Sequence, residues 1–196
     1  MDLFAAQPQT IVDDAEGGIR YWPDVVDGAT ADAWFSALHD DVPWKSERRP
    51  MYDRVVDVPR DLASFPLHGW PPGLPLDAIL DLVQRHVPAP YSAVGLNLYR
   101  DGSDSVAMHN DKLHDIAPGQ PITLLSLGHP RRMLVKAKAP GSRAVAVELG
   151  HGSLLSMSHA SQVTHEHGIP KTTQAVGPRI SVVFRARPNG WAPDRR

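Results

Sequence analysis

The sequence contains no cysteine among its 196 residues. This absence excludes a disulfide framework, a thiolate zinc site, an iron–sulfur cluster and a cysteine nucleophile. A bound metal would therefore have to be held by histidine, aspartate or glutamate. The sequence also lacks the glycine-rich phosphate loops of nucleotide-binding enzymes and the G-x-S-x-G motif of α/β-hydrolases, so hydride transfer, P-loop chemistry and α/β-hydrolase chemistry have no support.

Long apolar runs and a strong excess of charge are missing as well. No stretch approaches the length of a membrane span, and the start of the chain, MDLF, lacks the pattern of a signal peptide. We therefore expect a cytoplasmic protein without a membrane partner. The net charge of −2 indicates that the chain as a whole is not an electrostatic nucleic-acid binder, and such a role would need local basic patches.

Turn-forming residues are abundant, because 19 prolines and 15 glycines are present, and they favour a β-rich fold. Helical periodicity predicts helices over 30–41, with Thr30 as the N-cap, and over 75–87. The basic segment 44–60 between them shows no regular pattern. From residue 91 onward the apolar pattern has a period of two, which favours a sandwich, barrel or jelly roll. The expected strands are 91–100, 105–109, 122–127, 132–138, 144–149, 153–158, 163–167 and 179–187.

Four of these segments place polar, ligand-capable side chains on one face of the chain. These side chains are Asn97 and Tyr99; His109 and Asp111; His165 and His167; and Arg179, Ser181 and Arg185. One interpretation is that these faces meet solvent, as in many antiparallel sheets. The other is a barrel whose interior holds a metal at one end and two guanidinium groups placed for a dianionic ligand.

The pattern His109-x-Asp111 offers two metal ligands, although His-x-Asp is a weak motif by itself. Two histidines and one carboxylate from different strands suit the open iron site of non-heme Fe(II) oxygenases, and the same trio could hold a catalytic zinc ion. Spacing leaves the third ligand open. The candidates are His151, His159, His165 and His167.

Two basic segments, 44–60 and 131–143, bear on possible partners. The first interleaves aromatic residues, including Tyr52, with its cations, and the second contains no acidic residue. Its cations are Arg131, Arg132, Lys136, Lys138 and Arg143. Such segments are either solvated surface or contacts to a phosphate backbone, with aromatic side chains available for stacking on bases.

Five blocks of the sequence occur in the order typical of one known family. They are NLYRDGSDSVAMHND (97–111), LLSLGHPRRMLVK (124–136), HGSLLSMS (151–158), HGIPKT (167–172) and PRISVVFR (178–185). Together they resemble the AlkB family of Fe(II)/2-oxoglutarate-dependent dioxygenases, and a weaker likeness covers 44–60. The resemblance implies an α+β, mainly β fold: a double-stranded β-helix, or jelly roll, with N-terminal helices and a nucleotide-recognition lid.

The resemblance also implies the site residues. His109, Asp111 and His167, rather than His165, would be the catalytic iron ligands. The 2-oxoglutarate site would comprise Asn97, Tyr99, Arg179, Ser181 and Arg185. In it, Arg179 would pair with the distal carboxylate of 2-oxoglutarate and Arg185 with the carboxylate near the metal, since a guanidinium grips a carboxylate with two hydrogen bonds.

The implied activity is oxidative demethylation of N-alkylated bases in DNA or RNA by Fe(II), O2 and 2-oxoglutarate, with release of aldehyde, succinate and CO2. The target base would be single-stranded or flipped out of its stack. We expect the base to be contacted by Tyr52 or Phe65, with Trp70 as a competitor for the stacking role. We expect the phosphate backbone to be contacted by Arg131, Arg132 and Lys136.

The expected organisation is one monomeric domain over 1–196, with a lid at 44–72, a jelly-roll core at 90–187 and loose ends at 1–20 and 188–196. Many family members carry an acidic residue where this chain has Leu113. Together with a short segment at 61–72, this departure leaves open an alternative substrate, a protein side chain or a small molecule, for the same oxygenase chemistry.

Overall fold

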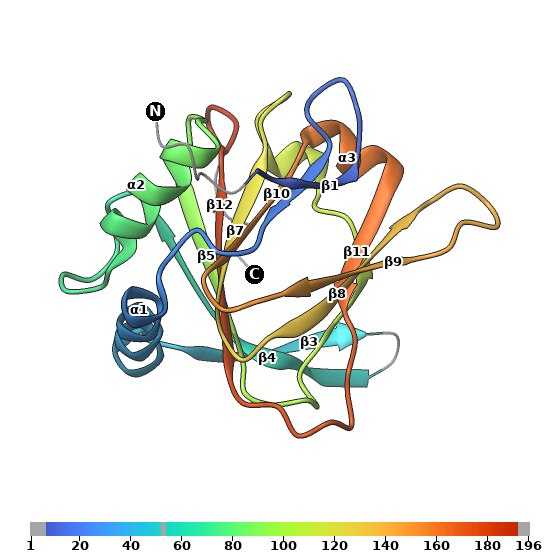
Figure 1. The fold of residues 1–196 in the computed structure, drawn as a ribbon. Coiled ribbons are helices and arrows are strands. Elements are labelled where there is room, and N and C mark those ends of the chain that lie inside the picture. The colour runs from blue at the N-terminus through green and yellow to red at the C-terminus, as the bar shows by residue number, and fades with distance from the viewer. Residues whose placement is uncertain (1–6, 52–53, 192–196) are drawn as a thin grey trace.

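The computed structural model describes residues 7–51 and 54–191, and within them two antiparallel sheets face each other (Figure 1). The larger sheet has the strand order β1-β2-β10-β7-β12-β5-β4-β3, and the smaller has the order β6-β11-β8-β9. The larger contains β1 (Gln9–Val12), β2 (Ile19–Trp22), β3 (Lys45–Met51), β4 (Arg54–Pro66), β5 (Ala93–Tyr99), β7 (Ile122–Gly128), β10 (Ser153–Met157) and β12 (Arg179–Arg185). The smaller contains β6 (Val106–His109), β8 (Arg131–Ala137), β9 (Val145–Leu149) and β11 (His165–Ile169). The predicted jelly roll is confirmed.

The eight strands predicted from residue 91 onward are all present. The largest difference is at β11, which begins at His165 rather than at residue 163 because a short helix, α3 (His159–Thr164), precedes it. The hydroxyl of Ser158 starts this helix by accepting a hydrogen bond from the backbone N–H of Ser161. A 3-10 turn, η1 (Leu113–Asp115), follows β6.

Two helices, α1 (Gly28–Asp41) and α2 (Leu76–His86), cover the outer face of the larger sheet (Figure 1). Apolar side chains of both helices form one core cluster with outward-facing residues of β5, β7 and β12. The N-cap of α1 is Asp27 rather than the predicted Thr30. The Asp27 carboxylate accepts the Thr30 N–H at 3.0 Å, because the backbone of Asp27 is extended and that of Thr30 is already helical.

A second apolar cluster fills part of the space between the two sheets. It joins inward-facing residues of the larger sheet, such as Leu124 and Val183, to Met133 and Val135 on β8. Both faces of the larger sheet are therefore covered, one by helices and one by the smaller sheet. No helix in the described ranges has the length and apolar character that crossing a membrane requires.

We expected residues 1–20 to be loose, but the described part of this N-terminal segment is ordered. β1 pairs with β2, which pairs with β10. The polar loop between β1 and β2 is fastened by Asp14, whose carboxylate accepts the N–H groups of Glu16 and Gly18 and the hydroxyl of Ser158. The polar composition that suggested disorder is thus used in tertiary hydrogen bonds.

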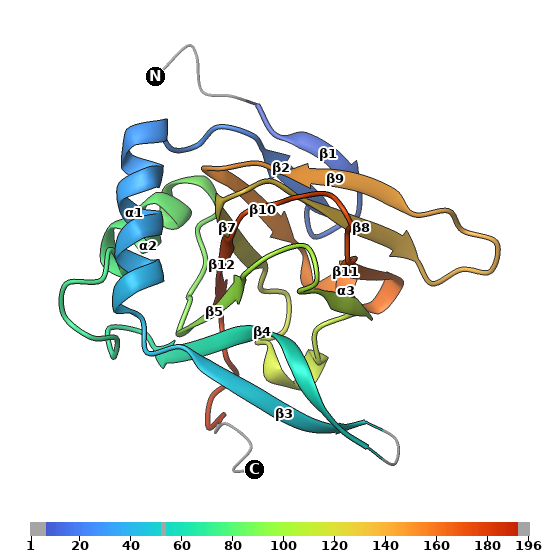
Figure 2. The same ribbon diagram turned by 90° about the horizontal axis from the view of Figure 1, so that it is seen from below.

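The segment 44–60 is also regular, against our prediction. β3 and β4 form a long hairpin at the edge of the larger sheet (Figure 2), and β4 pairs with β5 along residues 61–66. Frequent charges hide its β pattern in the sequence. This hairpin lies within the predicted lid, 44–72, and contributes Glu47, Arg60 and Leu62 to the wall of the central cavity.

Candidate active site

The polar faces of β5 and β12 point into a cavity of about 1200 Å³ between the two sheets. In the register of the two strands, Tyr99 lies opposite Arg179 and Asn97 lies opposite Ser181. All four line the cavity, whereas the alternate residues of β12, such as Val182, pack against the helices. Both faces of these strands are therefore buried, and the polar face borders an interior site instead of open solvent.

Three of the expected ligands meet at one end of this cavity. Donor atoms of His109, Asp111 and His167 all lie within 4.8 Å of one another. His109 and His167 are opposite each other on β6 and β11. The strands approach closely because Gly168 follows His167: a Cβ at Gly168 would lie 2.9 Å from the carbonyl oxygen of Val106. The structure thus brings together a facial set of two histidines and one carboxylate.

The other candidate histidines lie elsewhere. His165 shares the face of His167 but lies opposite Ala137, past the end of β6, and its Nδ1 bonds to the hydroxyl of Thr164. The Nδ1 of His151 accepts a hydrogen bond from the Gly128 N–H. Neither belongs to the cluster of potential ligands that the described residues form.

The protonation states in this cluster suit metal binding. His109 places Nδ1 2.8 Å from the carbonyl oxygen of Ala107, so Nδ1 donates this hydrogen bond and Nε2 is the ring nitrogen left for a metal. Burial, together with the neighbouring His109, lowers the pKa of His167 to about 4, so its imidazole is neutral at neutral pH. Burial raises the pKa of Asp111, but Arg185 and the two histidines outweigh it and hold that pKa below its usual value.

Arg185 orients the Asp111 carboxylate. Its Nε and Nη2 both donate to Oδ2 at 2.7 Å, and Oδ1 lies 3.9 Å from Nε2 of His109. Because both guanidinium donors use the same oxygen, the other oxygen is turned toward the histidines. The three side chains therefore offer two nitrogens and one oxygen as ligands, a set that fits Fe(II).

The backbone of Asp111 has its own support from α3. The side-chain carbonyl of Gln162 accepts the Asp111 N–H at 3.0 Å, and Gln162 is 1% exposed. Its Nε2 donates to the hydroxyl of Ser161. This contact spans 51 residues of sequence and no motif marks it, so sequence reasoning did not find it.

We expect Gln162→Leu to weaken Fe(II) binding about tenfold, because groups that orient metal ligands typically contribute that much to affinity. The substitution removes the acceptor for the Asp111 N–H and leaves a buried donor unpaired. Anaerobic titration with Fe(II) or Mn(II) measures the affinity. Gln162→Glu keeps an acceptor oxygen and should bind metal more tightly than the leucine variant. Equal metal affinity in wild type and Gln162→Leu would contradict the prediction.

The opposite end of the site contains a buried cation. Arg179 is 1% exposed, its Nε donates to the hydroxyl of Ser126 at 2.9 Å, and its guanidinium lies 5.2 Å from the Tyr99 ring centroid. Burial lowers the pKa of Arg179. Among the described residues no carboxylate forms an ion pair with it. A buried charge without a partner is costly, so this guanidinium fits an anionic ligand such as the distal carboxylate of 2-oxoglutarate.

Asn97 and Ser181 line the same part of the cavity, and Asn97 also has a protein partner there that we did not expect. The side-chain oxygen of Asn97 accepts a 2.9 Å hydrogen bond from Nε of Arg60. The Nη1 of Arg60 also donates to the backbone carbonyl of Ser105. Arg60 thus belongs to the site. Sequence reasoning counted it only as part of the basic segment 44–60.

The expected backbone-binding residues do not form one surface. Arg131 is 3% exposed, and its guanidinium donates to the carbonyl oxygens of Asp101, Asp104 and Pro170. The guanidinium carbon of Arg131 also lies 5.7 Å from the Tyr99 ring centroid, so Arg131 packs against a residue of the expected cosubstrate site. The expectation that Arg131 contacts phosphates is wrong, because tertiary packing covers it.

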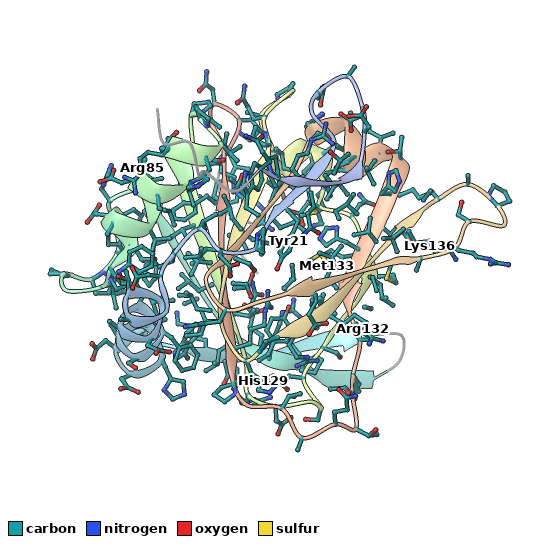
Figure 3. All side chains as sticks on the ribbon, viewed as in Figure 1. Tyr21, Arg85, His129, Arg132, Met133 and Lys136 are labelled. Carbon is teal, nitrogen blue, oxygen red and sulfur yellow. The ribbon has the colours of Figure 1, made fainter. Side chains whose placement is uncertain are left out.

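Arg132 and Lys136 are exposed, but they project from the outer face of β8, whereas Met133 lines the cavity (Figure 3). Arg132 lies opposite Glu148 on β9, and Lys136 lies opposite Glu166 on β11. Each cation therefore faces an acid on the neighbouring strand. This surface is neither strongly basic nor next to the metal ligands.

Two of the expected stacking residues, Phe65 and Trp70, do not line the cavity. Phe65, near the end of β4, and Trp70, after it, pack into the core cluster beneath the helices, and the indole N–H of Trp70 donates to Asp77 on α2. Tyr52 lies outside the described residues. Besides Arg60, the cavity wall contains cations that we did not assign, among them Lys112 and Arg187. The alternation of Arg179, Ser181, Val183 and Arg185 would have predicted Arg187 if it had been extended by one step.

Comparison with known proteins agrees with this site. Residues 18–185 match the 2OG-Fe(II) oxygenase superfamily. Human DNA oxidative demethylase ALKBH2 is 29% identical over 179 residues, which are 80% of this chain and 69% of that protein. Bovine alpha-ketoglutarate-dependent dioxygenase alkB homolog 3 is 29% identical over 184 residues, which are 83% of this chain and 64% of that protein. This chain therefore spans about two thirds of their lengths.

A solved structure, that of OsALKBH1, has the same fold. It superimposes with a TM-score of 0.64 at 16% identity, covering 86% of this chain and 97% of that one.

Proposed function

Since this chain belongs to the AlkB family of the 2OG-Fe(II) oxygenase superfamily, we propose that it oxidatively removes alkyl groups from the nitrogen atoms of bases in DNA or RNA. It is a dioxygenase that uses Fe(II) and 2-oxoglutarate. The names of its relatives, a DNA oxidative demethylase among them, support a nucleic-acid substrate.

The observation that most supports an anionic substrate is the charge of the cavity. Among the described residues, its wall contains five cationic and three acidic side chains, an excess of two positive charges, although the whole chain has a net charge of −2. The cations are Arg60, Lys112, Arg179, Arg185 and Arg187, and the acids are Glu47, Asp111 and Asp115. A site with this balance attracts polyanions such as nucleic acid.

Residues at the two ends of the cavity have different roles. His109, Asp111 and His167 would hold Fe(II), and Arg179, with Tyr99 against its guanidinium, would hold the dicarboxylate. Fe(II), 2-oxoglutarate and O2, when bound, would supply the oxidation that converts an N-methyl group to N-hydroxymethyl, with one oxygen atom of O2 entering the methyl group and the other entering succinate as CO2 leaves; the N-hydroxymethyl group would then release formaldehyde. Apolar side chains between the two ends, including Leu124 and Met133, exclude water from the reacting groups.

The target base has to leave its stack to reach these ligands, because they lie inside the fold. The cavity of about 1200 Å³ exceeds the roughly 300–1,000 Å³ of ordinary ligand sites, so it offers room for a base beside 2-oxoglutarate. A single-stranded or flipped nucleotide meets this requirement at the lowest cost in unpairing.

The test is product release with an N-methylated single-stranded oligonucleotide, in DNA and in RNA form. We expect formaldehyde and succinate in equal amounts and loss of the methyl group by mass spectrometry. The unmethylated oligonucleotide is the control. If succinate forms at the same slow rate with and without methylated nucleic acid and no formaldehyde appears, the substrate belongs to another class, such as a protein side chain or a small molecule.

A further inference from the structure

Arg187 extends the cavity-facing pattern of β12 beyond the end of the strand. It lines the cavity together with Arg185, and it is half-buried. Two residues of chain span at most about 7 Å, so the backbone of Arg187 lies within about 7 Å of Arg185, the residue that holds Asp111. It is therefore a cation at the rim of the cavity, near the metal-binding end.

The Arg187 guanidinium is held in place by two neighbours. Nη1 donates to the backbone carbonyl of Asp115 at 2.8 Å, and the guanidinium carbon lies 4.2 Å from the ring centroid of Trp191. Trp191 is itself fixed, because its indole N–H donates to the Asp115 carboxylate at 3.0 Å. These contacts also show that the described part of the expected loose end 188–196 is packed.

Within the part of the chain that the structure describes, Arg187 forms no ion pair with a carboxylate. Asp115 offers it a carbonyl oxygen, while the carboxylate of Asp115 receives the indole N–H. The Nε of Arg187 is buried and has no hydrogen-bond partner there. Burial and the nearby Arg185 lower the pKa of Arg187, against the opposite effect of the Asp115 and Asp111 carboxylates.

We propose that Arg187, stacked on Trp191, is a phosphate-binding subsite for the nucleotide whose base enters the cavity. This inference rests on the proposed function, because each nucleotide of a nucleic acid carries a phosphate close to its base. A planar guanidinium matches the geometry of phosphate oxygens, and its position is fixed before the ligand arrives. The subsite would favour phosphorylated substrates over the bare nucleoside.

The alternative is that Arg187 only fastens the C-terminal segment to η1. Two substitutions separate the possibilities. Arg187→Gln keeps a donor for the Asp115 carbonyl but loses the charge, whereas Arg187→Lys keeps the charge but loses the planar fork. Arg132→Gln, on the outer face of β8, is the matched control for removing one surface cation.

The experiment measures kcat/KM for three probes: 1-methyl-2′-deoxyadenosine, its 5′-monophosphate and a short single-stranded oligonucleotide with the same base. We expect wild type to prefer the monophosphate over the nucleoside by about tenfold or more, the range of a charge-assisted hydrogen bond. Arg187→Gln should lose most of this preference, Arg187→Lys should keep part of it, and Arg132→Gln should keep all of it. The oligonucleotide shows whether a phosphodiester acts as the monophosphate does.

The outcomes separate the two proposals. If Arg187→Gln lowers kcat/KM for nucleoside and monophosphate by the same factor, or if both Arg187 variants keep the wild-type preference for the monophosphate, Arg187 has only a fastening role. If wild type demethylates the nucleoside without preferring the monophosphate, the subsite is refuted while the proposed function stands. If wild type acts on none of the three probes, the proposed function fails and the subsite fails with it.

Discussion

His167→Ala is expected to lower the affinity for Fe(II) by more than about a hundredfold and to abolish 2-oxoglutarate turnover. Loss of a metal ligand costs more than loss of a group that merely orients one, which already costs about tenfold to a hundredfold. His167 is buried and neutral at neutral pH, so its lone pair is available without release of a proton. Anaerobic metal titration gives the affinity, and succinate release gives the turnover. The same loss is expected for His109→Ala and Asp111→Ala.

His165→Ala is the matched control, because the two histidines lie two residues apart on the same strand and the same face. His165 lies opposite Ala137 and bonds to Thr164, so its removal should leave metal affinity and turnover near their wild-type values. A variant pair in which His165→Ala is inactive and His167→Ala is active would show that the third ligand is misassigned.

Arg179→Ala is expected to lower the affinity for 2-oxoglutarate by more than about a hundredfold, because removing one partner of a buried ion pair costs about 3–5 kcal/mol. The guanidinium is 1% exposed and no acid of the described chain pairs with it. Isothermal titration with 2-oxoglutarate in the presence of Mn(II) measures the affinity. Arg179→Lys should also bind weakly, since an ammonium group cannot form the two parallel bonds of a guanidinium.

Arg132→Ala, on the outer face of β8, is the control for this measurement and should bind 2-oxoglutarate as wild type does. Unchanged 2-oxoglutarate affinity in Arg179→Ala would exclude Arg179 from the cosubstrate site. In that case the buried guanidinium would have only a structural role beneath Tyr99.

Local patterns in the sequence predicted the parts of the fold that depend on neighbours in the chain. Alternation along 179–185 separated Val182 from Arg185 because successive side chains of a strand point to opposite faces. The same rule placed Asn97 and Tyr99 together. It did not show whether the polar face meets solvent or a cavity, since that depends on the second sheet.

The tertiary structure decided which candidates meet. His165 and His167 have the same local pattern, and only the register of β6 against β11 places His167 opposite His109. Arg131 and Arg132 are adjacent in sequence, yet packing buries the first behind Tyr99 and exposes the second opposite Glu148. Neither result follows from composition, because strand register is a property of paired segments.

By itself, the sequence determined a cysteine-free, strand-rich chain with a His-x-Asp pair, a later histidine and two arginines six residues apart, and the family resemblance gave these residues their roles. The tertiary structure decided their environment: a carboxylate turned by Arg185, a buried Arg179 with no acidic partner among the described residues, and contributors that the sequence analysis did not assign to the site, among them Arg60, Gln162 and Arg187. The physical reason is that burial and long-range pairing set charge and orientation, and both arise only when distant segments pack together.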